Sequence, residues 1–325
     1  MDSEILTEDF RKETYNLNMQ NRGYIEQEIA PKDWSLGGIS AMPKVIERVD
    51  GQWDAFLPSL EIQRFPWGDS QACVSYSFLN VLETLQNKRG VKFNYSDRAL
   101  AKASGTTTSG NTMRKVADTA RLGGLCQEAL YGSEATSWND YYKALPVNVA
   151  KECSDFAGKH TIQYETVFYY PDQICQALQY SPLQIAMYAY GQYVDGIYQN
   201  PGNVQSNHCI ELYGYSYGKY WKVYDHYENS FKRLAWDYNI SFIYRINIET
   251  TMPEANPLGL ANNTICQLVE APGGVGLFLD NQILVGPIEK VQFAWLMRNK
   301  TAEFDSKKRP MVKADWDKYP KAQLP

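Results

Sequence analysis

The chain has 325 residues, a net charge of −5 and an isoelectric point near 5.4, and 44% of its residues are hydrophobic. This composition is typical of a globular protein with one large domain or two modest ones. The mildly acidic balance offers no basic surface for phosphate backbones, so nucleic acid is excluded as a predicted partner.

Residues 1–30 read as a polar arm without the apolar core of a secretory signal. No run of about 18 apolar residues, the length needed to cross a bilayer, occurs in the sequence. We therefore expect no membrane partner, and a location in the cytoplasm or within a larger assembly.

The cysteines are widely spaced and include no CxxC pair, so the sequence predicts neither a zinc site nor any other cofactor. In a reducing compartment they stay free thiols, and most free cysteines are small buried apolar side chains. The six are Cys73, Cys126, Cys153, Cys175, Cys209 and Cys266.

Residues 31–66 mix glycine, proline and apolar residues, which indicates an extended segment lying across a core. A helix is predicted over 69–89, because apolar residues recur there at three- and four-residue spacing. Ser70 is the expected N-cap, which places Cys73 in the first turn.

Two further helices are predicted in the first half of the chain. One begins after Ser96, a second candidate N-cap, and the other spans about 111–122 and ends at the Gly123-Gly124 pair. The polar stretch 106–111 between them is a predicted loop.

After about residue 160 the pattern changes to β-branched and aromatic runs separated by turn residues. These runs are TIQYETVFYY, PLQIAMYAY, HCIELYGYSY, YWKVYDHY and SFIYRINI. Helices followed by strands predict an α+β fold rather than alternating βαβ units. Residues 253–325 then read as a small β appendage with a charged tail, where a partner protein could dock.

A thiolate nucleophile needs a lowered pKa, a neighbouring base and donors for the oxyanion. Cys73 lies where the field of a helix N-terminus favours a thiolate. His208 begins a predicted strand, and Asp225 lies in the next one, which is expected to pair with it. Asp225 could therefore orient the His208 ring.

Four segments, in order, resemble the papain-like cysteine peptidases over roughly residues 32–250. SQACVSYSF is similar to the segment around the family's nucleophile, and SNHCIELYGYSYGKYWKVYDHY to its histidine segment. The other two are SDRALAKASGTTTSGN and ICQALQYSPLQIAMYAYGQYVDGIY. The resemblance implies a two-lobe fold with a helical N-terminal lobe and an antiparallel β C-terminal lobe, formed here by residues 31–252.

By that resemblance Cys73 is the nucleophile, His208 the general acid/base and Asp225 the group that orients the ring. Tyr227 takes the place of the tryptophan that shields the pair. The substrate would be a peptide or protein bound in extended form. The residues expected along its cleft are Ser109, Gly110, Asn111, Asn207 and Tyr227.

The sequence departs from the family at the glutamine that helps to bind the oxyanion, because Trp67 occupies its usual position. Gln63 ends an extended segment and is the favoured substitute, although it requires a four-residue insertion. Gln71 is the alternative, within the turn before Cys73. Asp225 also replaces the commoner asparagine.

Two other histidines compete with His208 for the role of base. His226 is adjacent to Asp225, but strand alternation places it on the opposite face. His160 is expected at the surface, and Cys209 is expected to point away from the cleft into the core.

The predicted function is therefore hydrolysis of peptide bonds through a thioester acyl-enzyme. One alternative keeps the triad and transfers the acyl group, as transglutaminases and amidases do. The other is a catalytically weak or inactive papain-like module with a structural or binding role in an assembly.

Overall fold

The computed structural model describes residues 22–29, 35–36, 45–227, 230–250, 266–271, 274–279, 282–285, 304–310 and 321–323. The chain divides into two units, Met1–Glu249 and Thr250–Pro325. Most of the predicted N-terminal arm lies outside the described residues, and its described part, 22–29, contains no helix.

The central helix, α2 (Cys73–Lys88), is buried on all sides from Cys73 to Gln86. A helix enclosed in this way belongs to the interior of a lobe. It begins at Cys73, and Ala72 at its N-cap position provides no side-chain cap. The prediction that Ser70 caps this helix is therefore wrong, because Gln71 turns the backbone with a φ of 55° between the two.

The other helices of this unit are α3 (Asp97–Ala103), α4 (Met113–Gly123), α5 (Trp138–Tyr141), α6 (Val147–Lys159) and α7 (Pro171–Leu178). The Ser96 cap is confirmed, since its side chain accepts a hydrogen bond from the Ala99 N–H. Helix α4 ends before Gly124, whose φ of 77° suits glycine. A 3-10 turn, η1 (Asp54–Phe56), and a short hairpin, β1 (Arg64–Phe65) with β2 (Gly68–Asp69), precede α2.

An eight-stranded, mostly antiparallel sheet forms the second lobe, in the order β3-β10-β4-β7-β8-β9-β6-β5. Its strands are β3 (His160–Thr166), β4 (Leu183–Met187), β5 (Tyr193–Val194), β6 (Ile197–Tyr198), β7 (His208–Ser216), β8 (Tyr220–Asp225), β9 (Ser230–Ala235) and β10 (Ile240–Thr250). Each of the five predicted β runs overlaps one of these strands, and β5, β6 and β9 are additions.

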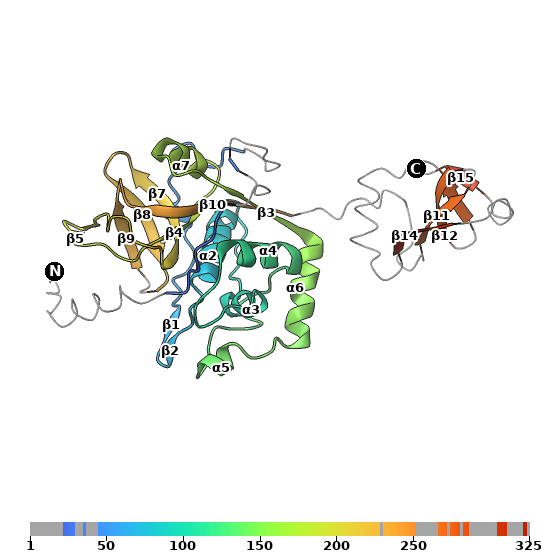
Figure 1. Ribbon diagram of the computed structural model, residues 1–325, viewed down its shortest axis with the longest axis horizontal. Coiled ribbons are helices and arrows are strands. Elements are labelled where there is room, and N and C mark those ends of the chain that lie inside the picture. The colour runs from blue at the N-terminus through green and yellow to red at the C-terminus, as the bar shows by residue number, and fades with distance from the viewer. Residues whose placement is uncertain are drawn as a thin grey trace. The chain divides into compact units, whose positions relative to one another are not determined.

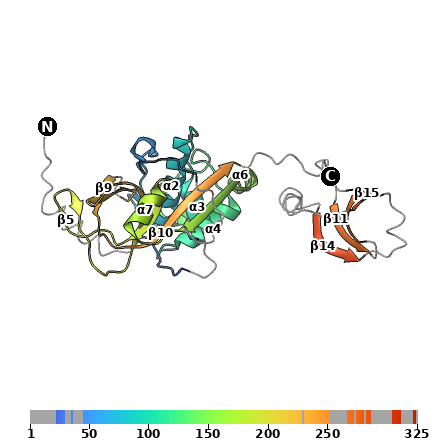
Figure 2. The ribbon, with the colours of Figure 1, turned by 90° about the horizontal axis from the view of Figure 1, so that it is seen from above.

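Helix α2 lies between the sheet and the remaining helices of the first lobe (Figures 1 and 2). It packs against β7 and β4 on one side and against α3 and α4 on the other. Apolar side chains from helices and strands form one continuous core. This packing brings the N-terminus of α2 to the beginning of β7, which sets the position of the site.

The second unit holds a five-stranded sheet in the order β14-β11-β12-β13-β15. Its strands are β11 (Cys266–Ala271), β12 (Gly274–Leu279), β13 (Gln282–Val285), β14 (Phe304–Pro310) and β15 (Lys321–Gln323). All five lie where the sequence predicted a small β appendage, and the last two come from its charged tail. The expectation that this appendage binds a partner protein stays a prediction.

Candidate active site

Cys73 is the first residue of α2, and its side chain is fully buried. The first N–H groups of a helix have no partner within the helix, and together they favour an anion at this end. The local cause of this placement is the tight turn at Gln71, which ends the β1–β2 hairpin and starts the helix at the cysteine. The thiol is therefore presented where a thiolate is stabilised.

His208 and Asp225 come together through the pairing of neighbouring strands. In the β7–β8 register Glu211 opposes Tyr224, so His208 at the start of β7 lies close to Asp225 at the end of β8. The two side chains are fully buried, with 2.9 Å between Nε2 of His208 and Oδ1 of Asp225. The carboxylate thus holds the orientation of the ring, as strand adjacency predicted.

The thiol and the imidazole interact electrostatically. Burial of Cys73 opposes the thiolate, but interactions with Cys209 and His208 outweigh it and lower the pKa of Cys73 to about 6. Burial also acts against the His208 imidazolium, yet Asp225 and Cys73 raise the pKa of His208 above its usual value. A lowered thiol pKa beside a raised imidazole pKa favours a thiolate–imidazolium pair.

Asp225 is held by more groups than the sequence suggested. Its Oδ1 also accepts a hydrogen bond from the Tyr227 N–H at 2.9 Å. Its Oδ2 accepts one from the Tyr190 hydroxyl and one from Nζ of Lys232, each at 2.6 Å. Burial opposes ionisation of Asp225, but Lys232 and His208 hold the pKa of this carboxyl well below its usual value.

The two remaining histidines are placed differently from His208. His226 is fully buried and stacks on Tyr76, with ring centroids 5.2 Å apart. Burial, followed by the charge of His208, lowers the pKa of His226 to about 3, so its imidazole is too weak a base to hold a proton near neutral pH. His160 is half-buried against Phe156, rather than fully at the surface as expected.

The two candidate oxyanion glutamines differ in what their amides contact. Gln63 is fully buried, and its Nε2 donates to the backbone carbonyl of Arg22 at 2.9 Å and to Oδ1 of Asp69 at 2.7 Å. The amide of Gln71 instead donates to Oδ2 of Asp69 at 3.0 Å. Gln63 therefore presents its amide to a carbonyl group of another segment, and Asp69 fixes both side chains.

The carbonyl that Gln63 contacts belongs to residues 22–25, which pass through the expected cleft. The Arg22 N–H donates to the Asn207 carbonyl at 3.0 Å. The Asn111 N–H donates to the Gly23 carbonyl at 2.9 Å, and the Ile25 N–H donates to the Asn111 carbonyl at 2.8 Å. Tyr24 thus forms an isolated parallel bridge with Asn111. The chain's own backbone occupies the place predicted for an extended substrate.

The side chains of this segment are buried at the site. The guanidinium of Arg22, which is fully buried, lies 4.3 Å from the ring centroid of Tyr227 and 5.6 Å from that of Tyr190. Tyr24 enters the core cluster, where burial and then the neighbouring Cys209 thiol raise its pKa. Cys209 is itself fully buried, as the sequence predicted, and its thiol also interacts with that of Cys73.

Gly23 is confined by backbone on both sides. It has a φ of 105°, and a Cβ there would lie 2.2 Å from the carbonyl oxygen of Gln71. On the other side, a Cβ at Gly110 would lie 2.0 Å from the carbonyl oxygen of Gly23. The segment can pass the site only because both positions are glycine.

The predicted cleft residues are distributed around this segment. Gly110, Asn111 and Asn207 contact its backbone, and Tyr227 lies under the Arg22 guanidinium with its ring 5.9 Å from that of His208. Ser109 is exposed on the neighbouring loop. The sequence reasoning missed Arg22, Gly23, Asp69, Tyr190 and Lys232. None of these residues stood out in the sequence, and Lys232 lies on a strand, β9, that was not predicted.

Within the described part of the chain, no group of three or more potential metal-ligating side chains comes together. In the same residues, no helix combines the length and apolarity required to span a bilayer.

No family profile matches the sequence, and no curated protein sequence is significantly similar to it. Solved structures do match. Xylellain, a cysteine protease from Xylella fastidiosa, superposes with a TM-score of 0.53 over 71% of this chain and 96% of its own, at 16% identity. The digestive procathepsin L2 proteinase of Tenebrio molitor larval midgut gives 0.51 over 78% and 84%, at 15% identity.

The chain has the papain-like fold. This confirms the predicted α+β class and two-lobe architecture with a C-terminal β appendage. At such low identity the likeness establishes the fold alone, so the roles of individual side chains depend on the geometry around Cys73.

Proposed function

We propose that this protein is a cysteine peptidase that hydrolyses peptide bonds through a thioester acyl-enzyme. The observation that carries the proposal is the environment of Cys73. Cys73 is the first residue of a buried helix, and its thiol interacts with the His208–Asp225 pair. Burial opposes the thiolate, yet the pKa of the thiol is lowered to about 6. Free buried cysteines ordinarily have a raised pKa.

The chemistry assigns one role to each group. The Cys73 thiolate attacks the carbonyl carbon of the scissile bond, and the Gln63 amide donates to the oxygen that becomes negative. Protonated His208 transfers its proton to the leaving amine as the C–N bond breaks. A water molecule then attacks the thioester while His208 accepts its proton, which releases the acid and restores the thiolate–imidazolium pair.

The position of residues 22–25 supports the assignment of Gln63. Its amide already donates to a backbone carbonyl, that of Arg22, in the cleft. We infer that this segment keeps the site latent, because a substrate backbone would need the same donors and acceptors on Asn111 and Asn207. Access to Cys73, which is fully buried here, then requires the segment to leave.

The test uses Gly23→Ala, because a Cβ at this position meets the Gln71 backbone and displaces the segment. Gly90→Ala is the matched control: its φ is also positive, at 78°, but no atom lies within 4 Å of the added Cβ. We would measure Cys73 alkylation by iodoacetamide from pH 4 to 10 (about the range of the relevant pKa values), together with cleavage of a peptide library.

We expect rapid alkylation in the Gly23→Ala protein from about pH 6 upward, with peptide cleavage, and loss of both after His208→Ala. Gly90→Ala should behave as wild type. An alkylation profile with an ordinary thiol pKa of about 8.5, unchanged by His208→Ala, would contradict the peptidase proposal and leave a papain-like scaffold. Equal rates of Cys73 alkylation in the wild type and in Gly23→Ala would contradict the inference that residues 22–25 keep the site latent, but not the peptidase proposal.

Products formed in the presence of an added amine distinguish hydrolysis from acyl transfer. The peptidase proposal expects the free acid as the main product, and predominant amide formation would instead favour the transglutaminase-type reading.

A further inference from the structure

Lys232 occupies a position where a β-strand normally carries an apolar side chain. On β9 the side chains of Phe231 and Arg233 are exposed, whereas Lys232 and Leu234 are buried. Only 8% of Lys232 is accessible. Burying an ammonium group is costly unless it is paired and hydrogen-bonded, so this lysine needs a specific partner.

That partner is Asp225. In the β8–β9 register Asp225 opposes Ser230, which makes Lys232 its diagonal neighbour, two residues further along β9. Nζ of Lys232 donates to Oδ2 of Asp225 at 2.6 Å, while Oδ1 serves His208. The ammonium also lies 4.2 Å from the ring centroid of Tyr190 and 5.9 Å from that of Tyr198. The two carboxylate oxygens thus have separate partners.

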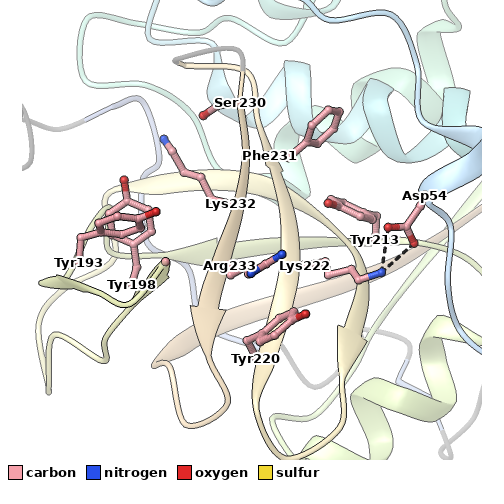
Figure 3. A pocket seen from close by; sticks show the side chains of 11 residues that line it. Asp54, Tyr193, Tyr198, Tyr213, Tyr220, Lys222, Ser230, Phe231, Lys232 and Arg233 are labelled. Carbon is pink, nitrogen blue, oxygen red and sulfur yellow. Dashed lines mark hydrogen bonds and ion pairs between the residues drawn. The ribbon is translucent and has the colours of Figure 1, made fainter. Parts of the chain in front are cut away.

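A second lysine on the same sheet provides a comparison. Lys232 and Lys222 line one hollow on the sheet, together with Tyr193, Tyr198 and Arg233 (Figure 3). Lys222 is paired with Asp54, at 2.8 Å, in a partly exposed ion pair. Figure 3 draws that pair, and the amine of Lys232 lies away from it. The two lysines therefore share a surface but serve different carboxylates.

The charges around His208 come from several elements. Cys73 faces it from α2, Asp69 from β2, and Asp225 with His226 from the end of β8. Arg22 reaches Asp69 from the N-terminal segment. Cys73, His208, Asp225 and Lys232 therefore form a series of alternating charge: thiolate, imidazolium, carboxylate and ammonium.

We propose that Lys232 is a positioning residue of this site, which fixes the Asp225 carboxylate through Oδ2 and offsets its charge toward His208. The proposal rests on the proposed peptidase function. Asp225 and Lys232 together act as a nearly neutral hydrogen-bond acceptor, so the ring is oriented without being locked in its protonated form. The last step of the mechanism needs this balance, because His208 must take a proton from water.

The proposal predicts opposite effects of two substitutions. Lys232→Met removes the cation that is paired with Asp225 and should raise the pKa of the His208 imidazole by about 1 unit, the size expected when the full carboxylate charge acts on the ring. Asp225→Asn leaves Lys232 as an uncompensated cation and should lower it. Adding Lys232→Met to Asp225→Asn should then bring the pKa of His208 back up, because an amide needs no balancing charge.

The experiment is a titration of the histidine ring protons by NMR in the full-length protein with Cys73→Ala, which removes the thiol from the titration. The chain has three histidines, so each signal can be assigned by single substitution. Lys232→Arg retains the cation and should leave the pKa of His208 unchanged. Lys222→Met, the matched control, removes a cation from the same hollow and should also leave it unchanged.

An equal pKa of His208 in wild type, Lys232→Met and Lys222→Met would overturn the proposal. A double variant in which the pKa falls further than in Asp225→Asn would do so as well. If Lys232→Met fails to fold, Lys232→Gln makes the same test, because its amide can still donate to Oδ2 of Asp225 but carries no charge. The titration requires no activity, so a shift without a reactive thiolate in Gly23→Ala would refute the peptidase function but not the Asp225–Lys232 coupling.

Discussion

At the scale of single residues, the favoured oxyanion glutamine and its alternative are separated by where their amides point. Gln63 donates to a carbonyl within the cleft, whereas Gln71 donates to Asp69 at the edge of its own turn. A donor contributes to catalysis only when it lies where the oxyanion forms. The geometry therefore favours Gln63, which is also the residue that the extended segment before the hairpin indicated.

In the opened Gly23→Ala protein, Gln63→Ala should lower the turnover number by about 10²–10³, the usual effect of losing one oxyanion donor. Gln71→Ala is the matched control and should change turnover by less than about tenfold, because its amide contacts no cleft carbonyl. The measurement is kcat on a cleaved peptide. Equal losses in the two variants would show that both amides act through Asp69 instead.

At the scale of elements, Arg98 binds the loop of residues 132–141 to the helical lobe through hydrogen bonds. Arg98 on α3 is buried and donates to the backbone carbonyls of Tyr141 at 2.8 Å, Glu134 at 2.8 Å and Gly132 at 3.2 Å, and also to that of Asp140. Its guanidinium lies 4.6 Å from the Tyr131 ring centroid. This side chain thereby replaces regular secondary structure as the support of the loop that carries α5.

Arg98→Met should reduce the free energy of unfolding by about 3 kcal/mol, because several buried carbonyls lose a charged donor. The comparison is Lys151→Met, which breaks an exposed ion pair between Lys151 and Asp155 and should leave the free energy of unfolding almost unchanged. Urea unfolding measures both. A loss at Arg98 as small as that at Lys151 would mean that water or other donors satisfy the freed carbonyls.

At the scale of the whole molecule, the interior of the first unit holds an unusual number of carboxyl groups. Burial is the largest cause of a raised pKa for every one of them, and their mutual repulsion adds to it for most. They are Glu61, Glu83, Asp97, Glu128 and Glu211. Such groups stay protonated inside the fold at pH values where the unfolded chain has lost those protons.

The consequence is a stability that falls as the pH rises. The pKa of Glu211 is raised from 4.5 to about 8, so between these values the native state holds a proton that the unfolded state lacks. Stability from this group is complete below pH 4.5 and declines through pH 8. Glu211→Gln should flatten the decline when urea unfolding is compared at pH 5 and pH 8.5 (about the two ends of this window); an unchanged slope would contradict it.

The sequence by itself determined the features that depend on neighbouring residues. The Ser96 cap, the strand runs and the order of helices before strands follow from local periodicity and capping. The meeting of His208 and Asp225 also follows locally, because strands adjacent in sequence pair. Even here the start of α2 differed, since the turn at Gln71 moved the first helical residue to Cys73.

The tertiary structure alone decided which side chains complete the site. Gln63 meets the carbonyl of Arg22, 41 residues away, and Asp225 meets Tyr190, 35 residues away. No periodicity encodes such contacts, because they depend on the path that each segment takes over an already folded core. The passage of Gly23 past Gln71 is of the same kind: a glycine in a polar arm gains its meaning only when two backbones must approach within van der Waals contact.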